Sequence, residues 1–375
     1  MRPELLRYKS CFAIIRLVGI EVQDEQLASG PAQVGNEVRA LISGCGVYRL
    51  ERALVSLTGE DRVRWLNGMV TNNVRDLAAD QGVYAFLLNP QGKIQADLYA
   101  FNQGESLLVE AERGQVETIL QIFDRYIIMD DVEVENLTGK FQVIGVAGSK
   151  SESVLAGAGL QVSGLQPLQI ADAEWNGAKL TVIRGDNPCV PNYELLVPEK
   201  DADPLWKGLL QAGAQEVQEQ ALEGFRIACG IPKFGVDIRQ RDLPQETGQD
   251  RALNFSKGCY IGQEIVERIR SRGAVHRVFT GFEIDGVPPP PGFRIQDDGK
   301  DIAELTSVVT LPASDRTLAL GYGRREFMMP GKEFVAGDTK LRVVALPFSG
   351  TFEATTKNGP NAGEGAPATQ SRHTI

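Results

Sequence analysis

The chain is poor in the residues that usually hold a metal ion or form a disulfide framework. Its 375 residues include 2 histidines and 5 cysteines, and the cysteines lie far apart in the sequence. No CxxC pair or mixed Cys/His cluster occurs. Zinc and iron–sulfur sites need such clusters, so the sequence excludes a self-contained site of that kind. The odd number of scattered cysteines predicts a reduced, cytoplasmic compartment.

Signals for membranes, secretion and nucleic acids are missing as well. No apolar run reaches the length of a membrane-spanning helix, and the nearest, residues 11–20, contains Arg16. No small-residue cleavage site follows an apolar stretch, so we expect no signal peptide. The net charge of −10 argues against general nucleic-acid binding, because a phosphate backbone attracts positively charged surfaces.

The sequence has instead the composition of a globular protein with several domains. Hydrophobic residues make up 42% and charged residues 23%, and the length predicts two or three domains. Alternation predicts one strand over residues 47–57, and an apolar stripe predicts a helix over residues 115–128. One helical region is expected from Pro204 to Cys229. Short β-like runs separated by turns at residues 275–348 predict a small antiparallel barrel.

The most informative segment is KGCYIGQE, residues 257–264. It places Cys259 two positions after Lys257 and just before a helix predicted to begin near Tyr260. A nearby ammonium and a helix amino terminus both favour the reactive thiolate, and Gly258 permits a turn closed to other residues. The alternative is an inert, buried cysteine at an ordinary junction between a loop and a helix.

A second constellation covers residues 226–237. Arg226 occupies the last turn of a predicted helix, and Gly, Pro, Gly and Asp follow it. This pattern predicts a fixed turn that presents polar groups. It fits a ligand-binding loop, and it equally fits a helix end followed by a surface loop.

Several carboxylates are candidates for binding or proton transfer. Asp97 and Glu194 lie on predicted strands, where a carboxylate that faces a ligand can accept N–H groups of a pterin-like edge or move a proton. The same alternation also fits side chains that point to solvent. We interpret Asp124, Asp130 and Asp131 as structural, because charged residues commonly solvate helix ends.

Taken together, these segments resemble YgfZ-type folate-binding proteins of iron–sulfur cluster maintenance. Residues 257–264 are similar to the K-G-C-Y-x-G-Q-E signature, and residues 226–237 to R-x-x-x-G-x-P-x-x-G-x-D. Residues 88–94, 124–132 and 320–323 also match. The cysteine motif is the specific one, whereas the other segments are shared with the aminomethyltransferase superfamily, which includes the T-protein of glycine cleavage.

The resemblance implies an α+β, three-domain, aminomethyltransferase-like fold with a central folate-binding channel and a small C-terminal antiparallel β-barrel. The expected parts are an N-terminal arm (1–35), a discontinuous folate-binding domain (36–140 plus 205–272), a second α/β domain (141–204), the barrel (273–348) and a disordered tail (349–375). The cofactor is expected to be tetrahydrofolate or a one-carbon derivative. Iron–sulfur client or assembly proteins are the expected partners, with no nucleic acid and no membrane.

The function implied is an accessory role in iron–sulfur cluster assembly or repair, more than that of a classical transferase. Cys259 and Lys257 would be the catalytic residues. The resemblance also implies folate-binding residues: Asp97, Glu194, Arg226, Tyr260, Gln263 and Glu264. The T-protein carries G-G-x-x-D-D-L, and this chain has Ala96 in place of the first of the two acids. The lost acid argues against transferase activity, whereas Asp97 keeps a folate-dependent aminomethyltransferase as the alternative. A folate sensor with a structural cysteine is a third interpretation.

Overall fold

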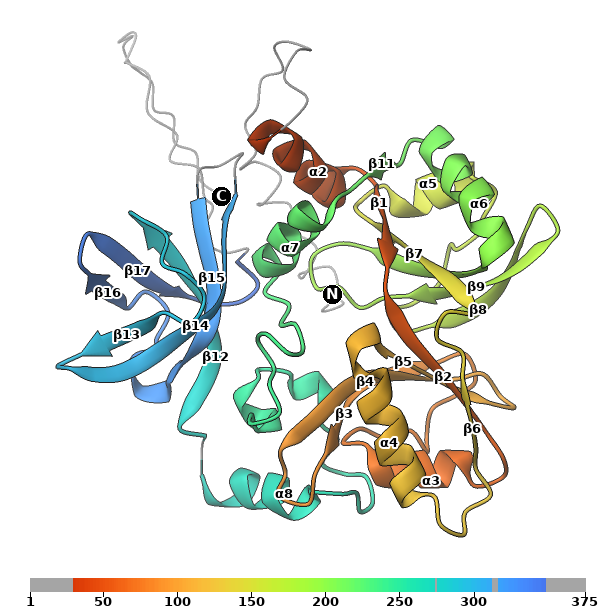
Figure 1. Cartoon of the computed structure of the whole chain (residues 1–375), viewed down its shortest axis with the longest axis horizontal. Coiled ribbons are helices and arrows are strands. Elements are labelled where there is room, and N and C mark those ends of the chain that lie inside the picture. Colours follow the sequence, from red (N-terminus) through yellow and green to blue (C-terminus); the bar gives the residue numbers. More distant parts are fainter. Residues whose placement is uncertain (1–29, 274, 312–315, 349–375) are drawn as a thin grey trace, which may run out of the picture.

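The computed structural model describes residues 30–273, 275–311 and 316–348 (Figure 1). The predicted tail, residues 349–375, and most of the predicted N-terminal arm lie outside these residues. The arm's last residues belong to a helix, α2 (Pro31–Ser43). Within the described residues, no helix is both long and apolar enough to cross a membrane.

Sheet B carries most of the candidate site. Its strands, in spatial order, are β3 (Gly82–Leu88), β4 (Ile94–Asn102), β5 (Leu107–Glu112), β2 (Arg52–Thr58) and β6 (Glu133–Asn136). Helices α3 (Arg62–Met69) and α4 (Val116–Tyr126) cover one face. Ile119 and Phe123, one helical turn apart, bury α4 against this face, so the predicted helix is confirmed.

Sheet A packs against sheet B through a shared apolar cluster that includes Leu54, Phe101 and Leu196. Its strands, in spatial order, are β11 (Gln215–Glu216), β1 (Gly46–Leu50), β7 (Phe141–Ala147), β10 (Asn192–Pro198), β9 (Ala178–Arg184) and β8 (Ile170–Trp175). Helices α5 (Ser151–Gly157) and α6 (Glu199–Gln211) close its core. Helices α2 and α7 (Glu219–Ala228) pack together beside it.

The C-terminal sheet is antiparallel and nearly closed. Its spatial order is β13 (Arg294–Asp297), β14 (Lys300–Leu311), β15 (Arg316–Arg324), β12 (Arg277–Asp285), β17 (Thr339–Val344) and β16 (Glu333–Ala336), with a short turn of 3-10 helix, η4 (Arg325–Phe327), after β15. The end strands β13 and β16 approach each other, which curls the sheet into the predicted barrel. Phe282, Leu305 and Leu341 are fully buried inside it.

The segment after α7 runs between the three sheets (Figure 1). It contains the short turns η2 (Pro244–Glu246) and η3 (Asp250–Ala252) and leads to α8 (Gln263–Arg272). Ile238 and Leu253 of this segment pack on Phe86 and Ile94, on the face of sheet B that α3 and α4 leave open. The segment therefore covers the second face of sheet B.

The prediction of one strand over residues 47–57 was wrong. Two strands meet there: β1 pairs with β7 in sheet A, and β2 pairs with β5 in sheet B. Val47 and Val55 therefore belong to different cores. Alternation indicates which residues of a strand are buried, but it does not identify the partner strand. The pattern therefore could not show that the chain passes from sheet A to sheet B.

The single helical region predicted from Pro204 to Cys229 was also wrong. The structure has two helices, α6 and α7, and β11 lies between them and pairs in parallel with β1. Gly213 has a φ of 101°, a left-handed conformation that ends α6. The fold is thus mixed α/β with a barrel sheet, as the sequence indicated, while the predicted division into three domains stays a prediction.

Candidate functional site

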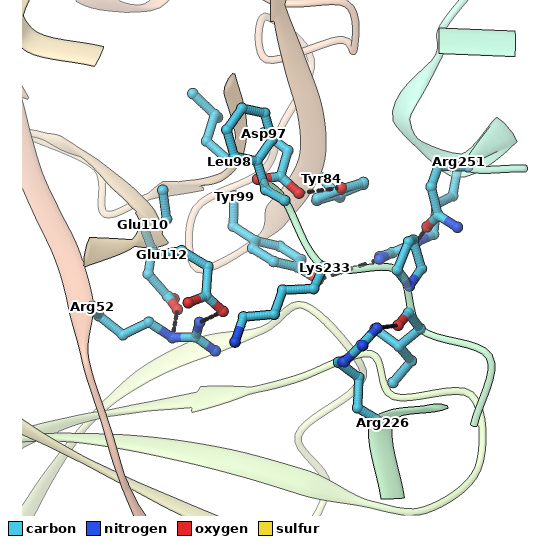
Figure 2. A pocket seen from close by; sticks show the side chains of 15 residues that line it. Arg52, Tyr84, Asp97, Leu98, Tyr99, Glu110, Glu112, Arg226, Lys233 and Arg251 are labelled. Atoms are coloured by element: carbon cyan, nitrogen blue, oxygen red, sulfur yellow. Dashed lines mark hydrogen bonds and ion pairs between the residues drawn. The ribbon is translucent and has the colours of Figure 1, made fainter. Parts of the chain in front are cut away.

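A cavity of about 140 Å³ lies between sheet B and the segment that follows α7 (Figure 2). Strands β2 to β5, the end of α7 and that segment supply its walls: Arg52, Tyr84, Asp97, Leu98, Tyr99, Glu110, Ala111, Glu112, Arg226, Ile231, Pro232, Lys233, Phe234, Gln249 and Arg251. The cavity combines acids, phenol rings and cations, a set suited to a polar aromatic ligand.

Asp97 reaches the cavity because side chains alternate along a strand. On β4, Ala96 and Ala100 are buried under the helices, whereas Asp97 lies on the opposite face. The Tyr84 hydroxyl donates to Asp97 Oδ2 at 2.6 Å, and Gln115 Nε2 donates to Oδ1 at 2.7 Å. Burial raises the pKa of Asp97, although these two donors oppose the shift. Asp97 can accept N–H groups of a ligand or take up a proton.

Gln115 fixes the orientation of the Asp97 carboxylate. Its Oε1 accepts the backbone N–H of Asp97 at 3.0 Å, so its Nε2 must face Asp97 Oδ1. A flipped amide would place an oxygen against the carboxylate and leave the backbone N–H without its acceptor. Gln115 is only 3% exposed and lies in the short turn η1 (Arg113–Gln115), so its own position is fixed by packing.

Arg52 joins three carboxylates from two sheets. Its Nη2 lies 2.5 Å from Glu194 Oε1, its Nε 2.9 Å from Glu110 Oε1, and its Nη1 3.2 Å from Glu112 Oε1. Burial, and then Glu194, raises the pKa of Glu110 well above its ordinary value. Burial acts on Glu194 too, but Arg52 outweighs it and the pKa of Glu194 is lowered. Of the two acids, Glu110 is therefore the one that takes up a proton first as the pH falls.

Arg226 is a structural clamp at the edge of the cavity. Its Nε and Nη2 donate to the carboxylate of Glu223, and Nη2 also donates to Ser307 Oγ at 2.9 Å. Its Nη1 donates to the Ile231 carbonyl and to Asp237 Oδ2, both at 2.6 Å. All five N–H groups of the guanidinium are therefore engaged within the protein. Arg226 lines the cavity, but its hydrogen bonds shape the loop after α7.

Tyr84 and Tyr99 form an aromatic wall. They are directly opposite each other in the β3–β4 register, and their ring centroids are 5.0 Å apart. The guanidinium carbon of Arg251 lies 4.2 Å from the Tyr84 ring centroid, and Arg251 is ion-paired with Asp186. The Tyr99 hydroxyl donates to Asp186 Oδ1 at 3.1 Å. Such a polar-edged wall suits the face of a flat heteroaromatic ring.

The KGCYIGQE segment lies apart from the residues that line the cavity. Lys257 is buried, and its Nζ donates to the carbonyls of Asn67, Val70 and Asn72 at 2.5, 2.6 and 2.7 Å. Burial, and then the charge of Arg75, lowers the pKa of Lys257 to about 7. Three acceptors need three donors, which only the ammonium form supplies, so Lys257 ties its loop to the end of α3.

Cys259 is exposed, and it lies further from the following helix than predicted. The helix α8 begins at Gln263, not near Tyr260, because Gly262 has the left-handed φ of 80° and helical geometry starts after it. Tyr260 is buried among the residues that cover sheet B. Gln263 is the first residue of α8 and Glu264 is exposed on it, so neither reaches the cavity.

Of the predicted site residues, the structure brings Asp97 and Arg226 to the cavity and links Glu194 to it through Arg52. The sequence reasoning missed cavity residues on both sides: Arg52, Tyr84, Tyr99, Glu110, Lys233 and Arg251. Extending the alternation from Asp97 would have found Tyr99, since residues two apart share a strand face. No pattern in the sequence indicates Arg251, because it reaches the cavity from the single short turn η3, which is too brief to show a periodicity.

Comparison with known proteins shows the family. The model of the GCVT N-terminal domain matches residues 25–257, more than half of the chain. The chain is 26% identical over 302 residues to an aminomethyltransferase of Rubrobacter xylanophilus, a match that covers 78% of this chain and 80% of the relative. It is 24% identical over 297 residues to a chloroplastic protein of Arabidopsis thaliana with a provisional transferase name, covering 78% and 68%.

The fold is shared as well. The crystal structure of the glycine cleavage system aminomethyltransferase T from Bartonella henselae superposes with a TM-score of 0.77 at 20% identity, covering 90% of this chain and 97% of that one. At this identity the likeness shows the fold alone, including the barrel sheet at the C-terminal end. The match to the family model goes further: the chain belongs to the GCVT family.

Proposed function

We propose that the chain binds tetrahydrofolate in the cavity and assists the assembly or repair of iron–sulfur clusters through the thiol of Cys259. The observation that carries the proposal is the exposure of Cys259 within a motif similar to the YgfZ signature. Cys45, Cys189 and Cys229, by contrast, are buried. Exposure matters because a thiol must meet its reaction partner to exchange sulfur or bind iron.

The residues of the cavity fit a reduced folate. A pterin ring presents a row of N–H groups, and the half-buried carboxylate of Asp97, which lines the cavity, is an acceptor for them. Tyr84, Tyr99 and Phe234 offer apolar faces against which its rings can pack. Tetrahydrofolate, when bound, would carry one-carbon units. The residues of this chain would orient it and exclude water around Asp97.

Iron or sulfur is cargo in this proposal. Across residues 30–273, 275–311 and 316–348, no group of three His, Cys, Asp or Glu side chains is placed to hold a metal ion. One thiol can carry a persulfide or supply one ligand to a transient cluster, so client or assembly proteins would supply the other ligands. Lys257 would act by holding the loop of Cys259 against α3.

Replacing Cys259 by alanine is expected to abolish the rescue of cluster-enzyme activity in a strain that lacks its own copy of the gene. The matched control is Cys45→Ala, because burial raises the pKa of that thiol to about 12 and keeps it unreactive. In native protein, iodoacetamide should label Cys259 and spare Cys45. Rescue by Cys259→Ala at the wild-type level would show that the thiol role is wrong.

A second candidate, a folate-dependent aminomethyltransferase, is favoured by the orientation of β4. Ala96, which stands where the T-protein motif has its first acid, is fully buried on the face away from the cavity. The cavity-facing acid, Asp97, is kept. The replacement of the first acid by Ala96 is therefore weaker evidence against aminomethyl transfer than the sequence alone indicated. Turnover of an aminomethyl donor with tetrahydrofolate, lost in Asp97→Ala, would favour this function, and no turnover would count against it.

A further inference from the structure

Four cations line the cavity, and three of them are already paired. Arg52 contacts Glu194, Arg226 contacts Asp237, and Arg251 contacts Asp186. The fourth is Lys233. In the described part of the chain, its Nζ makes no hydrogen bond or ion pair.

One acid lies near enough to Lys233 to feel its charge. Burial raises the pKa of Glu223, but Arg226, and then Lys233, lower it more. Glu223 already forms a bidentate ion pair with Arg226, so its charge is balanced without the ammonium of Lys233. The charge of Lys233 is therefore available to a ligand.

The backbone of Lys233 is held firmly while its side chain is not. Its N–H donates to Asp237 Oδ2 at 3.0 Å. Its carbonyl accepts the N–H groups of Val236, Asp237 and Ile238 at 3.2, 2.8 and 3.1 Å. Figure 2 shows the side chain extended across the cavity toward the side that carries Arg52 and Glu112. A lysine with a fixed backbone and an unpaired ammonium is suited to bind a ligand, because binding then costs only the conformational entropy of its side chain.

The size of the cavity indicates which part of a ligand this ammonium meets. About 140 Å³ is less than the roughly 300–1,000 Å³ of pockets that enclose drug-sized ligands, so a folate would fill the cavity with one end and project from it with the other. Asp97 is half-buried, whereas the side chain of Glu112 is 48% exposed and marks the open side. Lys233 extends toward this open side.

Among the described residues that line the cavity, Lys233 is the cation available to an anionic tail at the open side. Glu112 repels it, and the guanidinium of Arg52 is shared among three carboxylates. We propose that Lys233 binds a carboxylate of the ligand's glutamate tail and so selects folates over pterins that lack the tail. The inference rests on the proposed binding of tetrahydrofolate in this cavity.

The test is titration calorimetry of wild type and Lys233→Met with two ligands, tetrahydrofolate and 6-methyltetrahydropterin, which has the ring system without the tail. The variant should bind tetrahydrofolate about tenfold more weakly, about 1.4 kcal/mol, and bind the tail-less pterin as wild type does. Lys233→Arg should keep most of the affinity. Lys207→Met, at an exposed lysine of α6, is the matched control and should bind both ligands normally.

The outcomes separate this inference from the proposed function. Equal losses for both ligands, or no loss for either, would overturn the role of Lys233 while folate binding stands. A wild-type protein that binds neither ligand would refute the proposed function and this inference with it. Added salt should weaken tetrahydrofolate binding more in wild type than in Lys233→Met, since screening acts on the lost ion pair.

Discussion

Replacing Asp237 by alanine is expected to lower the free energy of unfolding by about 3–5 kcal/mol, the usual cost of breaking a buried charged pair. Asp237 is fully buried and accepts hydrogen bonds from Arg226 Nη1 at 2.6 Å and Ser307 Oγ at 2.8 Å, and from Thr306 Oγ1 and the Lys233 N–H. These donors come from α7, the following loop and the barrel. Urea unfolding of both proteins measures the loss.

The chain offers a matched control for this prediction. Asp203 pairs with Arg49 at 2.7 Å, nearly the same distance as the Asp237–Arg226 pair, but its side chain is 77% exposed. Asp203→Ala should cost less than about 1 kcal/mol, because water solvates both charges once the pair is lost. Similar losses for the two variants would contradict the view that Asp237 fastens the loop and the barrel to α7.

A loss of this size is large for a protein. Native domains are typically stable by about 5–15 kcal/mol, so Asp237→Ala would remove a substantial part of that stability. The loop from residue 231 to 234 also forms one wall of the cavity. Asp237→Ala should therefore weaken ligand binding as well as stability, because it frees this loop, even though Asp237 itself does not line the cavity.

Asp97→Asn is expected to weaken tetrahydrofolate binding about 10- to 100-fold. Hydrogen bonds to a charged acceptor contribute about 1.5–3 kcal/mol, and the asparagine removes the charge while keeping the shape. Its oxygen can still accept from Gln115, and its amide can donate to the Tyr84 hydroxyl, so the fold should be unchanged. Titration calorimetry measures the affinity, and unfolding experiments check the stability.

The pH dependence tests the same role of Asp97. Because burial raises the pKa of this carboxyl, the ionised form is complete only above the ordinary range of an aspartate. A ligand that donates N–H groups binds the ionised form better, so wild-type affinity should rise as the pH increases through this raised pKa. Asp97→Asn has no such group and should show a flat profile over the same interval.

The control for Asp97 is a strand aspartate outside the cavity. Asp172 lies exposed on β8 of sheet A, and Asp172→Asn should leave both the affinity and its pH profile unchanged. Unaltered binding by Asp97→Asn would exclude this carboxylate from ligand recognition. It would also count against the aminomethyltransferase alternative, which needs Asp97 to act on the ligand.

Local patterns in the sequence predicted local structure well. The stripe that includes Ile119 and Phe123 predicted α4 within two residues at its C-terminal end, since helical periodicity depends only on neighbours along the chain. Pro90 and Gly92 occupy the second and fourth positions that a type I turn favours, and the turn forms, with the Gly92 N–H donating to the Asn89 carbonyl at 2.9 Å. The barrel followed from regularly spaced short strands. The helix and the turn are each encoded by neighbouring residues, and the barrel by a series of such short segments.

The candidate site was less predictable because it is assembled from distant segments. Asp97 could be recognised as a strand acid, but only the pairing of β3 with β4 and the covering helices decided which face it occupies. Arg251 and Asp186 are paired across 65 residues of sequence. Lys257 looked like an activating cation beside Cys259, yet its ammonium is directed to three carbonyls near the end of α3.

The sequence by itself determined the aminomethyltransferase superfamily, the mixed α/β fold with a barrel, and the cysteine motif, because these depend on contiguous motifs and on periodicity. Only the tertiary structure decided which side chains share the cavity. It paired Arg52 with acids from two sheets, saturated Arg226 and left the ammonium of Lys233 extended into the cavity. The physical reason is that strand partners and loop paths are set by burial summed over the whole chain, which no local pattern records.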